Sequence, residues 1–68
     1  MQEFHIRLRS IRMEKKKTQK QTAEVLGMNL RSYRLYEQGT VEPNIKKLLT
    51  LADFFDVSLD YLMGRTDS

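Results

Sequence analysis

Residues 18–39 read TQKQTAEVLGMNLRSYRLYEQG and hold two short amphipathic segments separated by a glycine. The first segment opens with Thr18 and Gln21, spaced as in a capping box, in which each side chain accepts a hydrogen bond from the other residue's backbone N–H. Gly27 provides a C-terminal stop, and Asn29 caps the segment that follows. These capping and stop residues predict two helices joined by a turn of about three residues.

Such a short turn, with glycine at the bend, is typical of a helix-turn-helix motif, although tight corners occur in any helical bundle. On a helical wheel, Tyr33, Tyr36 and Glu37 fall on one side of the second segment. The opposite side carries Leu30, Arg31, Arg34, Leu35 and Gln38. Arginine binds guanine bidentately in the major groove, and apolar side chains contact the thymine methyl. We therefore expect residues 29–38 to read DNA bases through Leu30, Arg31, Arg34 and Leu35, although Leu35 could equally cover the edge of the core.

The beginning of the first segment is a candidate phosphate site. Free backbone amides at a helix N-terminus, with Thr18, Gln19 and Lys20 beside them, suit an anion. Thr18 would cap the helix in either case.

Three more helices are expected around this pair. Residues 3–16 carry an apolar stripe of Phe4, Leu8 and Ile11. Residues 44–55 are expected to bury Ile45, Leu48, Leu49, Ala52 and Phe55. Ser58 caps a short last helix over residues 58–63. Strand signals are weak, so the prediction is an all-α domain over residues 1–64, with a short tail at 65–68.

The amino-acid composition and the distribution of charge limit the functions that this protein can have. The chain has 68 residues, no cysteine, one histidine and a net charge of +3. Residues 1–34 hold nine Lys or Arg against three Asp or Glu, whereas residues 35–68 hold three against six. A basic half suits a polyanion, although ordinary solvated helix faces would look the same. No apolar run approaches a membrane span and no secretory signal opens the chain, so we expect a cytoplasmic protein.

An enzyme fits poorly. His5 lies near the N-terminus, where a solvated surface role is the ordinary one. No nucleophile motif or phosphate-binding glycine loop is present. We therefore expect no catalytic residue, metal or cofactor.

The order and spacing of several motifs resemble one known family. The motifs are Ile11-Arg12, Thr18-Gln19, Ala23, Leu26-Gly27, Tyr33, Tyr36-Glu37-Gln38-Gly39, Pro43, Leu48, Leu51-Ala52 and Val57-Ser58-Leu59-Asp60-Tyr61-Leu62. Over about residues 8–64 the chain resembles the phage repressor and Cro class of helix-turn-helix regulators, also called the xenobiotic-response-element family. The resemblance implies a compact five-helix, lambda-repressor-like domain with its third helix in the major groove of double-stranded DNA.

Site residues follow from the resemblance by position. Leu30, Arg31 and Arg34 match base-reading positions, and Gln19 and Gln38 match phosphate contacts, to which we add Thr40. Arg12 and Glu37 match an internal ion pair that ties the first helix to the end of the third. Lys17 and Thr22 depart from the family, which has apolar residues there, so the hydrophobic staple of the second helix is missing or built from the Lys17 stem.

The resemblance implies that the protein binds specific DNA sequences and regulates transcription, and we expect it to be a repressor. It also implies a protein encoded by a bacterium or a phage. Two-fold proteins read two-fold sites, with recognition helices about 34 Å apart. We therefore expect a homodimer on a pseudo-palindromic operator, joined through apolar residues of the last helix, Leu59, Tyr61 and Met63. The alternative is an antitoxin-type module, in which the same residues bind a toxin partner. These residues could also merely close the core.

Overall fold

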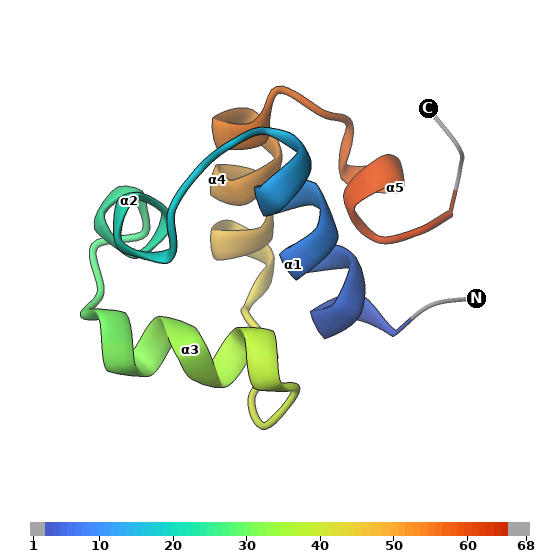
Figure 1. The fold of residues 1–68 in the computed structure, drawn as a ribbon. Helices are drawn as coiled ribbons and strands as arrows, with labels where there is room; N and C mark the ends of the chain where they lie inside the picture. Colours follow the sequence, from blue (N-terminus) through green and yellow to red (C-terminus); the bar gives the residue numbers. More distant parts are fainter. Residues whose placement is uncertain (1–2, 66–68) are drawn as a thin grey trace.

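The computed structural model describes residues 3–65 and contains, over that range, five α-helices and no strand. They are α1 (Phe4–Glu14), α2 (Gln19–Val25), α3 (Leu30–Gln38), α4 (Ile45–Phe55) and α5 (Leu59–Leu62), as Figure 1 shows. The prediction of an all-α, five-helix chain is confirmed. Residues 66–68 of the expected tail lie outside the described residues, and Arg65 is exposed.

The helix ends follow the predicted caps. The Thr18 hydroxyl accepts from the Gln21 N–H at 2.9 Å, and the Gln21 side chain accepts from the Thr18 N–H at 2.8 Å. Asn29 and Ser58 likewise accept from backbone N–H groups in the first turns of α3 and α5. Two helices are shorter than expected: α5 spans Leu59–Leu62, and α1 ends at Glu14, two residues before Lys16 turns into the left-handed region with φ 58°.

In Figure 1, α1 and α4 lie at the centre, with α2 and α5 on either side and α3 across the base. The core is Leu8, Ile11, Ala23, Tyr33, Tyr36, Leu51, Ala52, Phe55 and Leu62. Within residues 3–65, no helix has the length and apolar character that crossing a bilayer requires. The core therefore unites all five helices and leaves one side of α3 facing outward.

The buried face of α4 differs from the prediction. Ile45 is 71% exposed and Leu49 is 49% exposed, so neither belongs to the core. Leu51, which we did not assign to that face, is fully buried. Apolar residues surround most of this helix, so its periodicity allowed several faces, and only packing against its neighbours selects one.

At the two departures from the family, Lys17 and Thr22, each side chain has a contact of its own. Thr22 is fully buried, and its hydroxyl donates to the Thr18 carbonyl oxygen at 2.9 Å, which satisfies the polar atom. The Lys17 ammonium lies 5.1 Å from the centre of the Phe54 ring, a cation–π contact. The capping box and these contacts together hold the first turn of α2.

Candidate nucleic-acid interface

The outer face of α3 is the side that the helical wheel predicted. Tyr33, Tyr36 and Glu37 are buried, and the two tyrosine rings meet edge to face at 6.3 Å between centres. Arg31 and Arg34 are exposed, Leu30 is half-buried and Leu35 is 36% exposed. The four candidate base-reading side chains therefore share one accessible strip with two guanidinium groups on it.

The turn before α3 is built on backbone hydrogen bonds. Gly27 adopts φ 70°, a left-handed conformation that strains residues with a Cβ atom. The Met28 N–H donates to the Ala23 carbonyl oxygen at 3.1 Å, and the Gly27 N–H donates to the Glu24 carbonyl oxygen at 3.0 Å. These bonds close the end of α2 and set the direction in which α3 leaves it.

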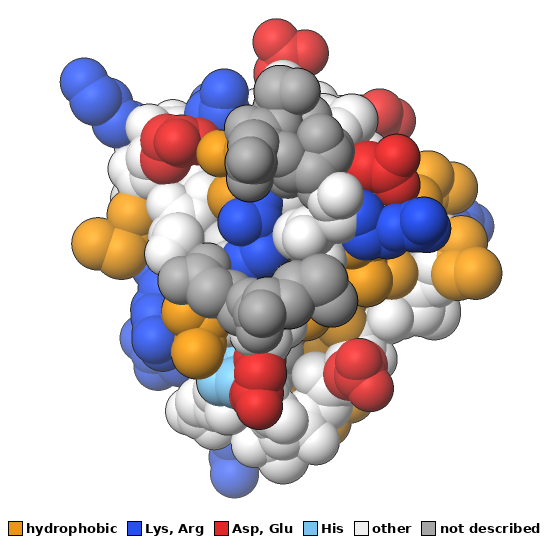
Figure 2. Space-filling model, turned by 90° about the vertical axis from the view of Figure 1, so that its right-hand side faces the viewer, with side chains coloured by type: hydrophobic (Ala, Val, Ile, Leu, Met, Phe, Trp, Pro, Cys, Tyr) orange, Lys and Arg blue, Asp and Glu red, His pale blue; other side chains and the backbone are white. Residues whose placement is uncertain are grey.

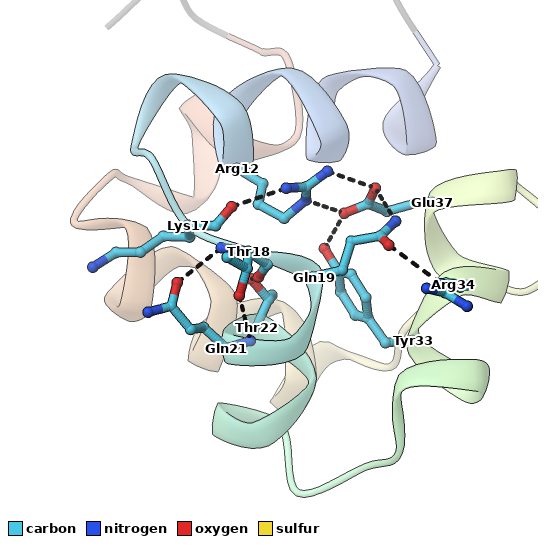
Figure 3. Close-up of polar contacts among 9 residues, drawn as sticks. All are labelled: Arg12, Lys17, Thr18, Gln19, Gln21, Thr22, Tyr33, Arg34 and Glu37. Carbon is cyan, nitrogen blue, oxygen red and sulfur yellow. Dashed lines mark hydrogen bonds and ion pairs between the residues drawn. The ribbon is translucent and has the colours of Figure 1, made fainter.

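A buried carboxylate holds the inner side of α3. Glu37 is 3% exposed and accepts from Arg12 Nε at 2.6 Å and from Arg12 Nη2 at 3.3 Å, so the two expected partners form a bidentate ion pair (Figure 3). Gln19 Nε2 donates to Glu37 Oε1 at 3.1 Å, and the Tyr33 hydroxyl donates to Glu37 Oε2. Arg12 also donates to the Lys17 carbonyl oxygen at 2.8 Å. One side chain of α3 is thus bonded to α1 and α2 together.

The electrostatics of this cluster keep Glu37 charged. Burial alone would raise the pKa of Glu37, but the hydrogen bonds from Arg12, Tyr33 and Gln19 outweigh burial and lower it. Its hydrogen bond to Glu37 raises the pKa of Arg12, and burial with the Glu37 contact raises the pKa of Tyr33. At neutral pH the cluster is therefore an ionised carboxylate surrounded by donors.

Of the five residues expected to contact phosphate, four have exposed side chains and one, Gln19, is hydrogen-bonded within the protein. Thr18 and Lys20 are exposed at the beginning of α2, and Gln38 and Thr40 are exposed at the end of α3. Gln19 differs from them, because its side-chain oxygen accepts from Arg34 Nε at 3.2 Å while its nitrogen donates to Glu37. The beginning of α2 therefore lies beside the second half of α3, and Gln19 is engaged within the protein.

The candidate dimer residues are less exposed than the sequence suggested. Leu59, Tyr61 and Met63 are all half-buried, and Leu59 and Tyr61 pack against the chain's own core. Arg7 lies over the Tyr61 ring at 4.8 Å from its centre and donates from Nε to the Tyr61 carbonyl oxygen at 3.1 Å. Figure 2 shows this side of the molecule, where hydrophobic side chains reach the surface among acidic and basic ones.

His5 is not the solvated surface residue that we expected. Its side chain is 25% exposed and lies 3.4 Å from the Glu3 carboxylate. A Cβ atom built on Gly39 would come within 2.8 Å of the His5 ring, so the ring packs on the glycine that ends α3. Across residues 3–65, no cluster of His, Cys, Asp and Glu could hold a metal ion.

Sequence reasoning missed two members of the Glu37 cluster. Tyr33 stands four residues before Glu37, so its place on the same helix face was a usable signal. Gln19 is 18 residues away from Glu37 and 15 from Arg34, and no local pattern marks contacts across that separation. The cluster as a whole is a product of packing.

Comparison with known proteins agrees with this geometry. A helix-turn-helix family model matches residues 8–62. The chain is 44% identical over 61 residues to the uncharacterized HTH-type transcriptional regulator YobD of Bacillus subtilis, a match that covers 90% of this chain and 54% of that protein. It is 41% identical over 59 residues to the cryptic phage CTXphi transcriptional repressor RstR of Vibrio cholerae, covering 87% of this chain and 53% of the repressor. The chain thus spans about half the length of these relatives.

A solved structure shares the fold. The P22 c2 repressor, in complex with synthetic operator 9T, superposes with a TM-score of 0.83 at 27% identity, over 97% of this chain and 100% of that one. The relatives named here are transcriptional regulators rather than enzymes. With its five helices, its short turn before α3 and the family match over most of its length, the chain belongs to the helix-turn-helix family, in the phage repressor and Cro type.

Proposed function

We propose that this chain binds double-stranded DNA sequence-specifically, with α3 in the major groove, and that it acts as a transcriptional repressor. The observation that carries the proposal is the outer strip of α3, where Arg31 and Arg34 are exposed beside two partly exposed leucines. The likeness to a repressor bound to its operator supports the same orientation.

Each group of residues has a role in this proposal. Arg31 and Arg34 donate to guanine O6 and N7, and Leu30 and Leu35 contact thymine methyl groups. Thr18, Lys20, Gln38 and Thr40, with the free amides at the beginning of α2, contact phosphates and fix the register. Base discrimination therefore belongs to the arginines and general affinity to the flanking residues.

Selection from random duplexes, followed by sequencing of the bound fraction, tests the proposal. Arg31→Ala and Arg34→Ala should each cost about 1–3 kcal/mol on the selected site and far less on unrelated DNA. Lys20→Ala serves as the contrasting variant, because losing a phosphate contact should reduce the salt slope by about one unit without changing base preference. Arginine variants that weaken all duplexes equally would remove the base-reading role.

The proposal includes a homodimer on a pseudo-palindromic site, formed through the side of α5. A domain of this size offers few base contacts, and pairing two recognition helices about 34 Å apart doubles them. The antitoxin-type alternative would use the same side of α5 for a different protein. Footprinting separates the two, because a homodimer protects two related half-sites without any added partner.

A further inference from the structure

The side-chain amide of Gln19 links the buried side of α3 to its exposed side. Gln19 Nε2 donates to Glu37 Oε1 at 3.1 Å, and Gln19 Oε1 accepts from Arg34 Nε at 3.2 Å. Figure 3 shows the amide lying between the two side chains. Gln19 belongs to α2, so this link joins the two helices of the motif at a base-reading candidate.

Glu37 determines which way this amide faces. An ionised carboxylate only accepts hydrogen bonds, so the amide nitrogen of Gln19 must point toward Glu37. The amide oxygen then points outward, where it meets Arg34. Because Glu37 is also held by Arg12 and Tyr33, its own position is fixed from two further directions. The acceptor offered to Arg34 is therefore set by the buried cluster.

Holding Arg34 by Nε has a consequence for base reading. The guanidinium group has five N–H donors, one on Nε and four on the two terminal nitrogens. With Nε occupied, the two terminal nitrogens remain available as an end-on pair, which suits the O6 and N7 acceptors of guanine. In residues 3–65, Arg31 has no comparable hydrogen bond, so its side chain keeps more conformational freedom to lose on binding.

We propose that Gln19 is a positioning residue for base reading, which holds Arg34 so that its terminal nitrogens face a guanine edge. This proposal rests on the proposed function, since it requires α3 to lie in the major groove. It differs from the expected phosphate role of Gln19, because its effect is confined to the base pair that Arg34 reads. Preorganising a side chain lowers the entropy that binding costs.

A double-mutant cycle tests the proposal. Fluorescence anisotropy measures the affinities of the parent, Gln19→Ala, Arg34→Ala and the double variant for the selected duplex and for one with the Arg34-dependent base pair replaced. We expect Gln19→Ala to weaken binding to the selected duplex about two- to tenfold. We expect no further loss from Gln19→Ala in the Arg34→Ala background or on the replaced base pair.

Two controls keep the result specific. The same cycle between Gln19 and Arg31 should give independent, multiplying effects, because these side chains share no bond. Gln19→Met keeps the length of the side chain without either hydrogen bond, and thermal melts show which variant remains folded at the assay temperature. The Met variant should reproduce the binding loss of the Ala variant.

Three outcomes are decisive against the idea. If the Gln19 and Arg34 effects multiply, or if Gln19→Ala weakens all duplexes alike, Gln19 is a phosphate or structural residue and the positioning role is wrong. If Arg34→Ala loses base discrimination while the Gln19 variants bind like the parent, the proposed function stands and only this inference falls. If neither arginine affects discrimination, DNA reading through α3 fails as well.

Discussion

Glu37 and Arg12 form an ion pair that is largely removed from water, with side chains 3% and 13% exposed. Removing one partner of a buried pair leaves the other charge without compensation, which typically costs about 3–5 kcal/mol. We expect Arg12→Ala and Glu37→Gln each to lower the free energy of unfolding by about 3 kcal/mol, as urea titration would show. DNA affinity should fall with stability, because α3 loses its bonds to α1 and α2.

The control is Arg9→Ala, an exposed arginine on the same helix, which should change stability by less than about 0.5 kcal/mol. If Arg12→Ala unfolds at the same urea concentration as Arg9→Ala, the ion pair contributes nothing measurable. A loss in Arg12→Ala alone would mean that the guanidinium bond to the Lys17 carbonyl oxygen matters more than the Glu37 bond.

The lowered pKa of Glu37 predicts how the free energy of unfolding depends on pH. Its pKa in the folded protein is lowered below the ordinary glutamate value, which is about 4.3. The folded state therefore binds the proton less readily than the unfolded state, and the stabilisation is complete above the ordinary value and declines as pH falls through the lowered one. Tyr33 has a raised pKa, so its contribution declines in the opposite direction, as pH rises past about 10.

Urea titrations at several pH values measure this dependence. The stability difference between the parent and Glu37→Gln should be constant from pH 5 to 8 and should shrink below about pH 4. A difference that stays constant down to pH 3 would show that Glu37 titrates alike in the folded and unfolded states.

The glycines before and after α3 differ in how much an added Cβ atom should destabilise the protein. Gly27 and Gly39 flank this helix with φ 70° and 79°, conformations that cost a residue with a Cβ atom about 1–2 kcal/mol. At Gly27 an added Cβ meets open space, whereas at Gly39 it would lie 2.8 Å from the His5 ring. We expect Gly39→Ala to lower the melting temperature more than Gly27→Ala, because it adds a steric clash to the same backbone strain.

The clash can be separated from the strain. In a His5→Ala background, Gly39→Ala should cost about as much as Gly27→Ala. Equal costs of the two glycine substitutions in the parent would show that the His5 ring moves aside freely. The contact is of interest because it ties the end of α3 to the beginning of α1.

The assembly is a prediction about the molecule as a whole. Met63 is half-buried at the end of α5 and is absent from the residues that pack on the core, so a charge there should disturb the fold little. We expect Met63→Glu to shift the sedimentation equilibrium toward monomer and to weaken operator binding at least tenfold, since each subunit would then bind one half-site alone. Met13→Glu is the matched control, because Met13 is 64% exposed at the far end of α1.

A parent protein that sediments as a monomer on and off DNA would contradict the homodimer. If Met63→Glu and Met13→Glu dimerise equally, the interface does not include the end of α5.

The ends of the helices could be predicted from the sequence. Thr18, Asn29 and Ser58 cap helices in any context, because each side chain bonds to a backbone N–H only three residues away. The two faces of α3 were also predictable, since buried tyrosines and exposed arginines separate at the helical period. These features depend on neighbours within a few residues, so the number, type and order of the helices followed from the sequence.

The remaining features required the folded chain. The face that α4 buries depends on where α2 and α5 pack against it, and seven apolar residues around one helix allowed several answers. The contacts from Gln19 to Glu37 and Arg34, and from His5 to Gly39, join residues that are far apart along the chain. Loop geometry and helix packing bring such residues together, and neither leaves a periodic signal, so tertiary structure alone placed Gln19 between a buried carboxylate and an exposed arginine.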